Sequence, residues 1–573
     1  MERMRIYFEL PLILLMNFLP MLLLLGLCYA MTNRAWISWL ITSVFFLLFF
    51  FINYFKVALR GEPFVADDFF VAGDGLSILD EYTLHIPKIL WLSLLAVALG
   101  TVLLARYARG RVPKHRWWIR PIIAAVCIAI GLTTWFTLYR DETLYRSTRL
   151  KTQSVFSAFR DEEISASAGL VWSFLRTVDE LSPSAPDGYS KADSEAMLAE
   201  TPDVLIPESQ RVNVVVTMLE SYSDLSVFDG VRFTADPYAE IHALRDESYS
   251  GTLIVDSIGG GTINAERSFL TGFSYPQPKY RRNTQSFVRY FSENGYTTVG
   301  AHPGVGSFYS RISINKAIGF DDFLFYRDGF SELATEDNTY GKTSYLNDAA
   351  FFTELRNIYE RRDASTPYFS FSVTYQGHSP YSSSALDGGE YVSHDGLSDE
   401  AYCIVNNYLN SVAQTGKAVA EYVDTFRDDE EPVVLVFFGD HKPTLGSGYS
   451  YYEDMGIISD KLSGSEIRSA IYSTPYLIWA NDAAKEVLGK DFSGTGETIS
   501  PCYLMSILFD CCGWEGSSWI QNQRSLRQAL PVLHYGRYFL VDGALTDRLP
   551  DALAPVYRKY SCLEYYLRQQ IPS

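Results

Sequence analysis

Four side chains that can bind a metal ion and transfer a phosphate group stand far apart in the chain. They are Glu220, Thr262, Asp440 and His441. The glutamate and the aspartate each follow an apolar run, the histidine follows the aspartate, and the threonine follows three glycines. Carboxylate, imidazole and alkoxide ligands suit Mn²⁺, Mg²⁺ or Zn²⁺. We therefore predict one site at which a divalent cation activates an alcohol.

Thr262 is the predicted nucleophile. The glycines 259–261 allow a close backbone approach, and residues 263–270 have helix-forming character, which places the hydroxyl near a helix N-terminus. The dipole and N–H groups there favour an alkoxide and an incoming phosphate. Metal coordination activates a hydroxyl that is otherwise a poor nucleophile. The alternative is that Thr262 only caps the helix after a flexible turn.

Glu220, Asp440 and His441 are the predicted metal ligands. An adjacent Asp and His at the end of a buried strand rarely serve packing, because an unpaired charge is costly to bury. Glu220, taken alone, could instead be a carboxylate at the start of a helix.

Two histidines and one arginine are candidates for contacts to the substrate. His302 and His378 follow apolar runs, where they could hold a phosphate or protonate a leaving group. A lone histidine is often a partly buried structural residue instead. Arg311 could bind a phosphate through two parallel hydrogen bonds, and its alternative is a surface ion pair.

The C-terminal three fifths of the chain alternate short apolar runs with helical stretches. This pattern is typical of an α/β domain whose mostly parallel sheet is covered on both faces. The side chains named above follow such runs, and in these sheets chemistry collects at the carboxyl ends of the strands. The predicted strands are Val212–Leu219, Gly251–Val255, Thr297–Ala301, Tyr368–Thr374, Val433–Phe438 and Pro475–Trp479.

Four apolar stretches in the first 140 residues predict an uncleaved membrane anchor, because about 20 apolar residues cross the hydrocarbon core. The basic loop 106–116 should stay in the cytoplasm, so the fourth span delivers the rest of the chain to the outside. With four spans the N-terminus also falls outside, although Arg3 and Arg5 favour the cytoplasm. The stretches are Leu10–Met31, Trp36–Phe55, Ile89–Ala105 and Pro121–Tyr139.

Charge and cysteine usage exclude some classes of protein. The chain has a net charge of −19, with about +5 on residues 1–150 and about −24 on residues 151–573, and this acidic outer part argues against nucleic acid as a partner. No Cys-x-x-Cys occurs among the seven cysteines, so a zinc ribbon or a thioredoxin-type site is not expected. A disulfide among the outer cysteines and buried free thiols both remain open.

These patterns predict four segments. Residues 1–140 form the transmembrane anchor of about four helices, and 141–210 a juxtamembrane helical segment and linker. Residues 211–545 form the extracellular catalytic domain, and 546–573 a C-terminal helical tail.

Several motifs resemble the lipoteichoic acid synthase family, membrane-anchored phosphoglycerol transferases of the sulfatase/alkaline-phosphatase superfamily. The resemblance spans roughly residues 205–540. It rests on the Leu-Glu-Ser ending of the strand at 213–221, the Gly-Gly-Gly-Thr segment 259–272, the stretch 302–311 and the Gly-Asp-His segment 439–443.

The resemblance implies a manganese-type ion held by Glu220, Thr262, Asp440 and His441. It also implies substrate contacts from His302, Tyr309, Arg311 and His378. Tyr309 replaces the tryptophan of the lipoteichoic acid synthases, and Lys442 stands where glycine or leucine is more familiar, which leaves the acceptor open. The family anchor has five spans, so four here fit loss of the first.

The expected activity is transfer of glycerol phosphate from a membrane phospholipid such as phosphatidylglycerol, through a phospho-threonine, to a glycolipid, a teichoic-acid-type polymer or an envelope glycan. Phosphoethanolamine transfer or phosphodiester hydrolysis at the same site is an alternative. A sulfatase proper is disfavoured, because no Cys/Ser-x-Pro-x-Arg segment occurs. A non-catalytic envelope scaffold is a further alternative.

Overall fold

The chain folds into two compact units, Met1–Pro183 and Ser184–Ser573. The computed structural model describes residues 11–60, 63–66, 87–108, 110–141, 144–145, 168–178, 185–274, 280, 284–306, 308–340, 345–446, 450–534 and 538–569.

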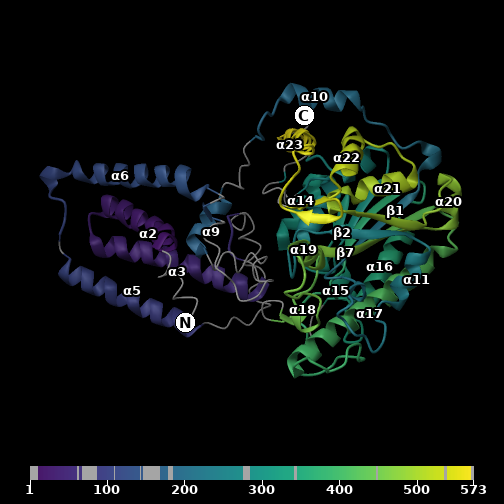
Figure 1. Cartoon of the computed structure of the whole chain (residues 1–573), viewed down its shortest axis with the longest axis horizontal. Helices are drawn as coiled ribbons and strands as arrows, with labels where there is room; N and C mark the ends of the chain where they lie inside the picture. The colour runs from purple at the N-terminus through teal and green to yellow at the C-terminus, as the bar shows by residue number, and fades with distance from the viewer. Residues whose placement is uncertain are drawn as a thin grey trace. The chain divides into compact units, whose positions relative to one another are not determined.

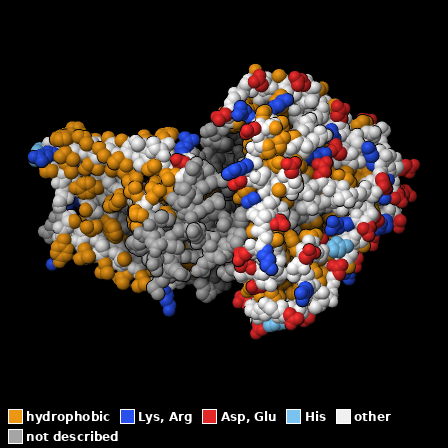
Figure 2. Space-filling view, viewed as in Figure 1, with side chains coloured by type: hydrophobic (Ala, Val, Ile, Leu, Met, Phe, Trp, Pro, Cys, Tyr) orange, Lys and Arg blue, Asp and Glu red, His pale blue; other side chains and the backbone are white. Residues whose placement is uncertain are grey.

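The first unit holds four helices that are long and apolar enough to cross a membrane. In it α2 packs against α3 and α6, and α3 packs against α5. Their outward side chains are large and apolar, and Figure 2 shows hydrophobic atoms spread over these helices. The predicted four-helix anchor is confirmed by length and composition. The helices are α2 Pro11–Thr32, α3 Ala35–Arg60, α5 Lys88–Tyr107 and α6 Ile119–Thr134, which a π-helical turn, Trp135–Tyr139, extends.

A short helix of the same unit, α9 (Leu170–Thr177), is capped by a side chain from α2. Its own N-cap, Gly169, has φ 86° and no capping side chain. The side-chain amide of Asn17 caps the helix instead: its oxygen accepts from the N–H groups of Val171 and Trp172 at 3.1 and 3.2 Å. A Cβ at position 169 would lie 2.2 Å from that amide. Glycine therefore permits the close approach that satisfies the helix end.

The second unit is built on an eight-stranded sheet of order β4-β3-β5-β1-β6-β7-β2-β8. All its strands run in one direction except β7, which is antiparallel to both neighbours. The mostly parallel α/β sheet is thus confirmed. The strands are β1 Asn213–Leu219, β2 Tyr249–Ile254, β3 Thr297–Ala301, β4 Asp322–Leu324, β5 Tyr368–Val373, β6 Val433–Gly439, β7 Ser473–Ala480 and β8 Gly494–Ile499.

All six predicted strands occur, with ends within two residues of the predicted ones. Within this sheet, the two strands that were not predicted, β4 and β8, lie at its two edges. Three residues form β4, and β8 is largely exposed. An edge strand needs no continuous apolar run, so its sequence lacks the pattern by which the inner strands were found.

Helices cover both faces of this sheet, as Figure 1 shows. The layers follow from β1, which is buried along its whole length. Its residues Val214, Val216 and Met218 pack in one core with α12, α13 and α21. Helices α11, α16 and α17 pack together on the other side. Their bounds are α11 Ala239–Asp246, α12 Thr262–Thr271, α13 Phe287–Glu293, α16 Asp348–Arg361, α17 Asp399–Arg427 and α21 Leu504–Cys512.

The remaining helices surround these layers, and a three-stranded antiparallel sheet lies near the C-terminus. The helices are α10 Lys191–Glu200, α14 Arg311–Ile318, α15 Phe330–Leu333, α18 Ser450–Asp454, α19 Gly464–Tyr472, α20 Asp482–Leu488, α22 Ser518–Ala529 and α23 Ala554–Gln569. The small sheet comprises β9 Leu533–His534, β10 Tyr538–Val541 and β11 Ala544–Thr546.

Candidate active site

Parallel pairing of β1 with β6 brings the two predicted carboxylate ligands together. Leu219 pairs with Gly439, so the next residue of each strand, Glu220 and Asp440, leaves the sheet at the same edge. A Cβ on Gly439 would lie 1.9 Å from the carbonyl oxygen of Tyr222. The small residue therefore lets the turn after β1 lie directly against the end of β6.

The hydroxyl of Thr262 reaches this pair from α12. Its oxygen lies 3.1 Å from Glu220 Oε2 and 3.3 Å from His441 Nε2. His441 Nε2 in turn lies 3.3 Å from Asp440 Oδ2 and 3.7 Å from Glu220 Oε1. All four side chains are buried. The structure thus brings together the four residues that the sequence placed in one site.

The converging atoms are almost all acceptors, which fits a cation. His441 Nδ1 lies 2.9 Å from the carbonyl oxygen of Lys442, so Nδ1 carries the proton and Nε2 presents a lone pair. Asp440 Oδ1 accepts from two backbone N–H groups, whereas its buried Oδ2 has no hydrogen-bond partner among the described residues. Ligand atoms of Glu220, Asp440 and His441 lie within 4.8 Å of one another.

The electrostatics of the two buried carboxylates also favour a bound cation. Burial, reinforced by the neighbouring Glu220 carboxylate, raises the pKa of Asp440 well above its ordinary value. The ammonium group of the adjacent Lys442 does not neutralise these carboxylates, since it donates to the carbonyl oxygen of Ser473. Two buried carboxylates without a cation are costly. The donor set therefore fits a divalent metal ion, which Glu220, Asp440 and His441 would hold together with the Thr262 oxygen.

Glycine 261 gives Thr262 its place at the start of α12. Gly261 has φ 77°, in the left-handed region, and forms the N-cap without a capping side chain. A Cβ there would lie 2.8 Å from Ser257 Oγ. Thr262 is therefore the first residue of the helix and not its cap, so its hydroxyl is free to face the metal ligands.

Arg311 is not free to bind a phosphate through its Nε–Nη2 edge. Both nitrogens donate to Glu266 Oε2, at 3.0 and 2.8 Å, in an ion pair that is almost fully buried. One of the two bidentate edges of Arg311 is therefore used within the protein, and the ion pair is buried rather than at the surface. A contact of Arg311 with substrate would come from Nη1 and from the second N–H of Nη2. Its guanidinium also faces the ring of Tyr309 at 5.3 Å.

His302 and His378 both lie near the Tyr375 ring. His302 is buried, its Nδ1 lies 3.1 Å from the carbonyl oxygen of Val373, and burial, with Arg311 nearby, holds its pKa well below the ordinary value. It is therefore neutral at pH 7. His378 stacks on Tyr375 with a ring distance of 5.1 Å. Within the described part of the chain, the Nδ1 atoms of both histidines lie against backbone carbonyl oxygens, and neither histidine forms a hydrogen bond to a metal ligand.

A buried aspartate supports the turn that carries His378. Asp348, at the start of α16, accepts from the N–H of Gln376 and from the hydroxyl of Thr415, and its own N–H donates to the Gln376 side chain at 2.8 Å. In the same turn, a Cβ on Gly377 would lie 1.9 Å from the carbonyl oxygen of Glu220. The network therefore holds this turn against a metal-ligand segment.

Replacing Asp348 by asparagine should change how stability depends on pH. Burial raises the pKa of Asp348 to about 6, from 3.8. Its folded form thus binds the proton more tightly, and its stability contribution is full below pH 4 and is lost as the pH rises through 6. Thermal unfolding of the full chain in detergent should show that, as the pH rises across this window, the stability of Asp348→Asn increases relative to that of the wild type, by up to about 3 kcal/mol. Parallel pH profiles would contradict this assignment.

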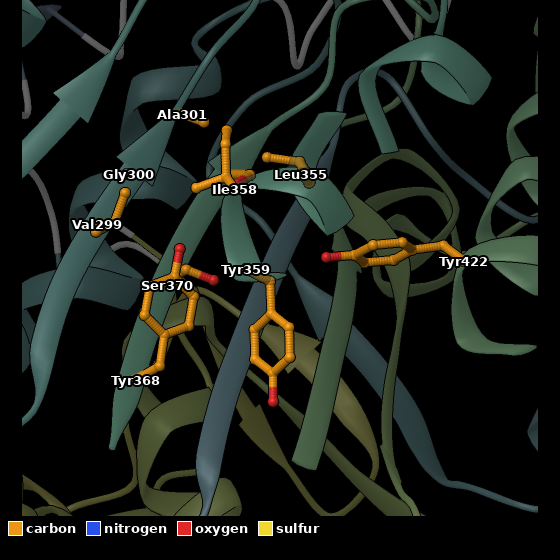
Figure 3. A pocket seen from close by; sticks show the side chains of 10 residues that line it. Val299, Gly300, Ala301, Leu355, Ile358, Tyr359, Tyr368, Ser370 and Tyr422 are labelled. Carbon is orange, nitrogen blue, oxygen red and sulfur yellow. The ribbon is translucent and has the colours of Figure 1, made fainter. Parts of the chain in front are cut away.

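A small pocket lies away from the metal ligands, between β3, β5, α16 and α17. Figure 3 shows the rings of Tyr359, Tyr368 and Tyr422 around it. Burial raises the pKa of Tyr368 to about 12, so this phenol stays neutral. Tyr359 accepts from the amide of Asn213 at 2.9 Å. The pocket contains buried structural tyrosines and none of the predicted site residues.

Three polar residues near the site were not predicted from the sequence. Glu266 and Arg267 follow the nucleophile on α12, and Asp348 begins α16. Glu266 lies one helical turn after Thr262, on the same face, and this spacing was a usable signal. Asp348 had none, because its role arises from contacts with Gln376 and Thr415, which are distant in the chain.

Two curated proteins are similar in sequence to this chain. A Rhizobium meliloti protein, provisionally named for cyclic beta-1,2-glucan modification, is 25% identical over 434 residues, which cover 73% of this chain and 64% of that protein. Lipoteichoic acid synthase 1 of Bacillus subtilis is 23% identical over 245 residues, covering 40% of this chain and 36% of the relative. The chain thus aligns with less than two thirds of the length of either curated relative.

Among solved structures, the Streptococcus pyogenes phosphoglycerol transferase GacH in complex with sn-glycerol-1-phosphate shares the fold. The TM-score is 0.51 at 18% identity, and the match covers 67% of this chain and 94% of that one. The sulfatase family model matches residues 212–513, which contain the whole metal-ligand set. That region is more than half of the chain, and the protein is therefore a member of the sulfatase family.

Proposed function

We propose that the protein is a metal-dependent phosphoglycerol transferase. It takes glycerol phosphate from a membrane phospholipid, phosphatidylglycerol, through a covalent phospho-Thr262, and passes it to a glycolipid, a teichoic-acid-type polymer or an envelope glycan. The observation that carries the proposal is the position of Thr262 Oγ1, within 3.3 Å of both a carboxylate and an imidazole of the metal-binding group.

The chain's own residues account for both halves of the reaction. Glu220 Oε2 accepts the hydrogen of the Thr262 hydroxyl, whose oxygen attacks phosphorus while the P–O bond to diacylglycerol breaks, and that proton ends on the departing diacylglycerol oxygen. An acceptor hydroxyl then attacks the phosphorus, the P–O bond to Thr262 breaks, and the acceptor's proton restores the threonine hydroxyl. A bound divalent cation, Mn²⁺ in this proposal, supplies positive charge that stabilises the alkoxide and the phosphate oxygens. The first turn of α12 directs its N–H groups at the same charge.

The substrate side of the site comprises the residues that lie next to the metal ligands. Arg311 Nη1 contacts a phosphate oxygen, the Tyr309 ring packs on the glycerol group, and neutral His302 accepts a hydrogen bond from it. His378, on the Tyr375 ring, faces the incoming acceptor. The name of the Rhizobium meliloti relative supports a glucan of the envelope as that acceptor.

The four apolar helices support a place in the cell membrane. Residues 1–140 form the anchor and 141–210 the connecting segment, with the catalytic domain 211–545 and its tail 546–573 on the extracellular side. The basic loop between α5 and α6 then faces the cytoplasm.

Product analysis with the full chain tests this function. In phosphatidylglycerol vesicles with Mn²⁺, we expect release of diacylglycerol and transfer of glycerol phosphate to an added glucan or glycolipid. Phosphatidylethanolamine vesicles are the matched comparison. Preferred release from phosphatidylethanolamine would instead identify a phosphoethanolamine transferase, and release to water with no transferred group would identify a hydrolase.

A further inference from the structure

Arg267 is a buried cation beside the proposed site whose charge is not neutralised. It is only 8% exposed, and its Nη2 donates to the carbonyl oxygen of Tyr309 at 2.6 Å. Its Nε has no hydrogen-bond partner within the described part of the chain. The guanidinium lies over the ring of Tyr280 at 4.9 Å. Neither a carbonyl nor a ring cancels a full positive charge.

The carboxylate of Glu266 acts on both arginines, since it raises the pKa of Arg267 as well as that of Arg311. Arg311 and Glu266 form a closed ion pair, whereas Arg267 forms no ion pair with any described residue. Arg267 therefore leaves about one positive charge buried here, and such a charge requires an anion.

The position of Arg267 relates this charge to the substrate. Both arginines contact Tyr309, since Arg311 faces its ring and Arg267 binds its carbonyl oxygen. Arg311 is in turn close enough to Glu220 for that carboxylate to raise the pKa of Arg311. Burial lowers the pKa of Arg267, which reflects the energetic cost of a charge held without a partner.

Tyr309 itself is held in an unusual backbone conformation. Tyr309 and Ser310 have φ 58° and 54°, two consecutive non-glycine residues in the left-handed region. Such a conformation persists only where surrounding contacts hold it. The hydrogen bond from Arg267 to the Tyr309 carbonyl is one such contact, so the same guanidinium both shapes this turn and sets the charge beside it.

We infer that Arg267 determines the class of donor by charge: it favours phospholipids with a net negative charge and an uncharged polyol headgroup, and it rejects headgroups that carry an ammonium. This inference rests on the proposed function and specifies its donor. The phosphodiester of phosphatidylglycerol brings the single anion that the buried guanidinium lacks. Phosphatidylethanolamine carries the same phosphodiester, but its ammonium would be repelled by the guanidinium, because like charges repel strongly in a partly buried site.

The test compares the two donors in variants of the full chain. In vesicles of phosphatidylglycerol or phosphatidylethanolamine with Mn²⁺, Arg267→Gln should reduce the ratio of diacylglycerol released from the two donors by about tenfold. Arg267→Lys keeps the charge and should keep most of the preference. Arg289→Gln is the matched control, because Arg289 also donates to backbone carbonyl oxygens, those of Thr284 and Ala317, on the neighbouring helix α13.

The outcomes separate charge selection from a structural role. The inference would be overturned if Arg267→Gln lost equal activity with the two donors. It would also be overturned if Arg267→Lys lost the donor preference as completely as Arg267→Gln. A readout without turnover is binding of glycerol phosphate against phosphoethanolamine to the full chain, measured by thermal shift. The wild type should prefer glycerol phosphate, and Arg267→Gln should not. If the wild type releases no diacylglycerol, the proposed function fails while this binding ratio still decides the role of Arg267.

Discussion

Replacing Thr262 by alanine should reduce release of diacylglycerol from phosphatidylglycerol by at least about 10⁴-fold, because it removes the oxygen that forms the covalent intermediate. The remaining ligands Glu220, Asp440 and His441 should still bind the metal, with lower affinity, since only one of four donor atoms is lost. The measurements are diacylglycerol release by the full chain in vesicles and the metal content of the purified protein.

Two variants and one mass measurement sharpen this result. Thr262→Ser keeps an oxygen and should retain part of the activity. Thr271→Ala removes another buried threonine of α12, whose hydroxyl donates to the carbonyl oxygen of Arg267, and should leave transfer intact. Mass spectrometry of the wild type with donor alone should find glycerol phosphate on Thr262. Turnover that persists in Thr262→Ala would exclude the covalent route.

Replacing Asp440 by asparagine should reverse the effect of metal on stability. Without metal, Asp440→Asn should unfold at a higher temperature than the wild type, because one of two buried, closely spaced carboxylates loses its charge. With Mn²⁺ the order should invert, since the wild type gains the binding free energy of the ion and the variant does not. Metal affinity should fall by at least about 100-fold, because replacing even a residue that only hydrogen-bonds to a metal ligand can lower the affinity by up to that factor. Transfer activity should be lost with it.

The geometry of Asp440 makes asparagine a sharp probe. Its Oδ1 accepts from the N–H groups of Ser221 and His441, and an amide oxygen can keep both bonds. Only Oδ2, which faces the ligand group, changes. Asp224→Asn is the matched control. The buried carboxylate of Asp224 already has Arg245 at 3.3 Å, so this substitution should leave the response of stability to Mn²⁺ unchanged. Equal stabilisation of Asp440→Asn and wild type by Mn²⁺ would remove Asp440 from the metal site.

The metal-ligand group was accessible to sequence reasoning for a physical reason. A parallel sheet buried on both faces needs continuous apolar strands, so a charged residue directly after such a strand marks its carboxyl end. Glu220 and Asp440 stand at such positions on neighbouring strands. Thr262 was accessible because three glycines before a helix indicate a close backbone approach.

Pairings between helices were not accessible in this way. The bidentate edge of Arg311 belongs to Glu266, 45 residues away, and nothing in either segment indicates that partner. The charge of Arg267 is left without an ion-pair partner among the described residues because Glu266 pairs with Arg311. The Asn17 cap of α9 likewise joins residues about 150 positions apart. Such contacts depend on how packed elements meet.

The amino-acid sequence alone determined the four apolar helices, the inner strands of the sheet and the chain positions of the metal-binding and hydroxyl side chains, because burial imposes local apolar patterns that can be read in order. Only the tertiary structure decided which of these side chains point at one another, which arginine is neutralised and which keeps its charge. Those outcomes depend on distances between segments remote in the chain, and at a few ångströms in a buried site such distances govern the electrostatic energy.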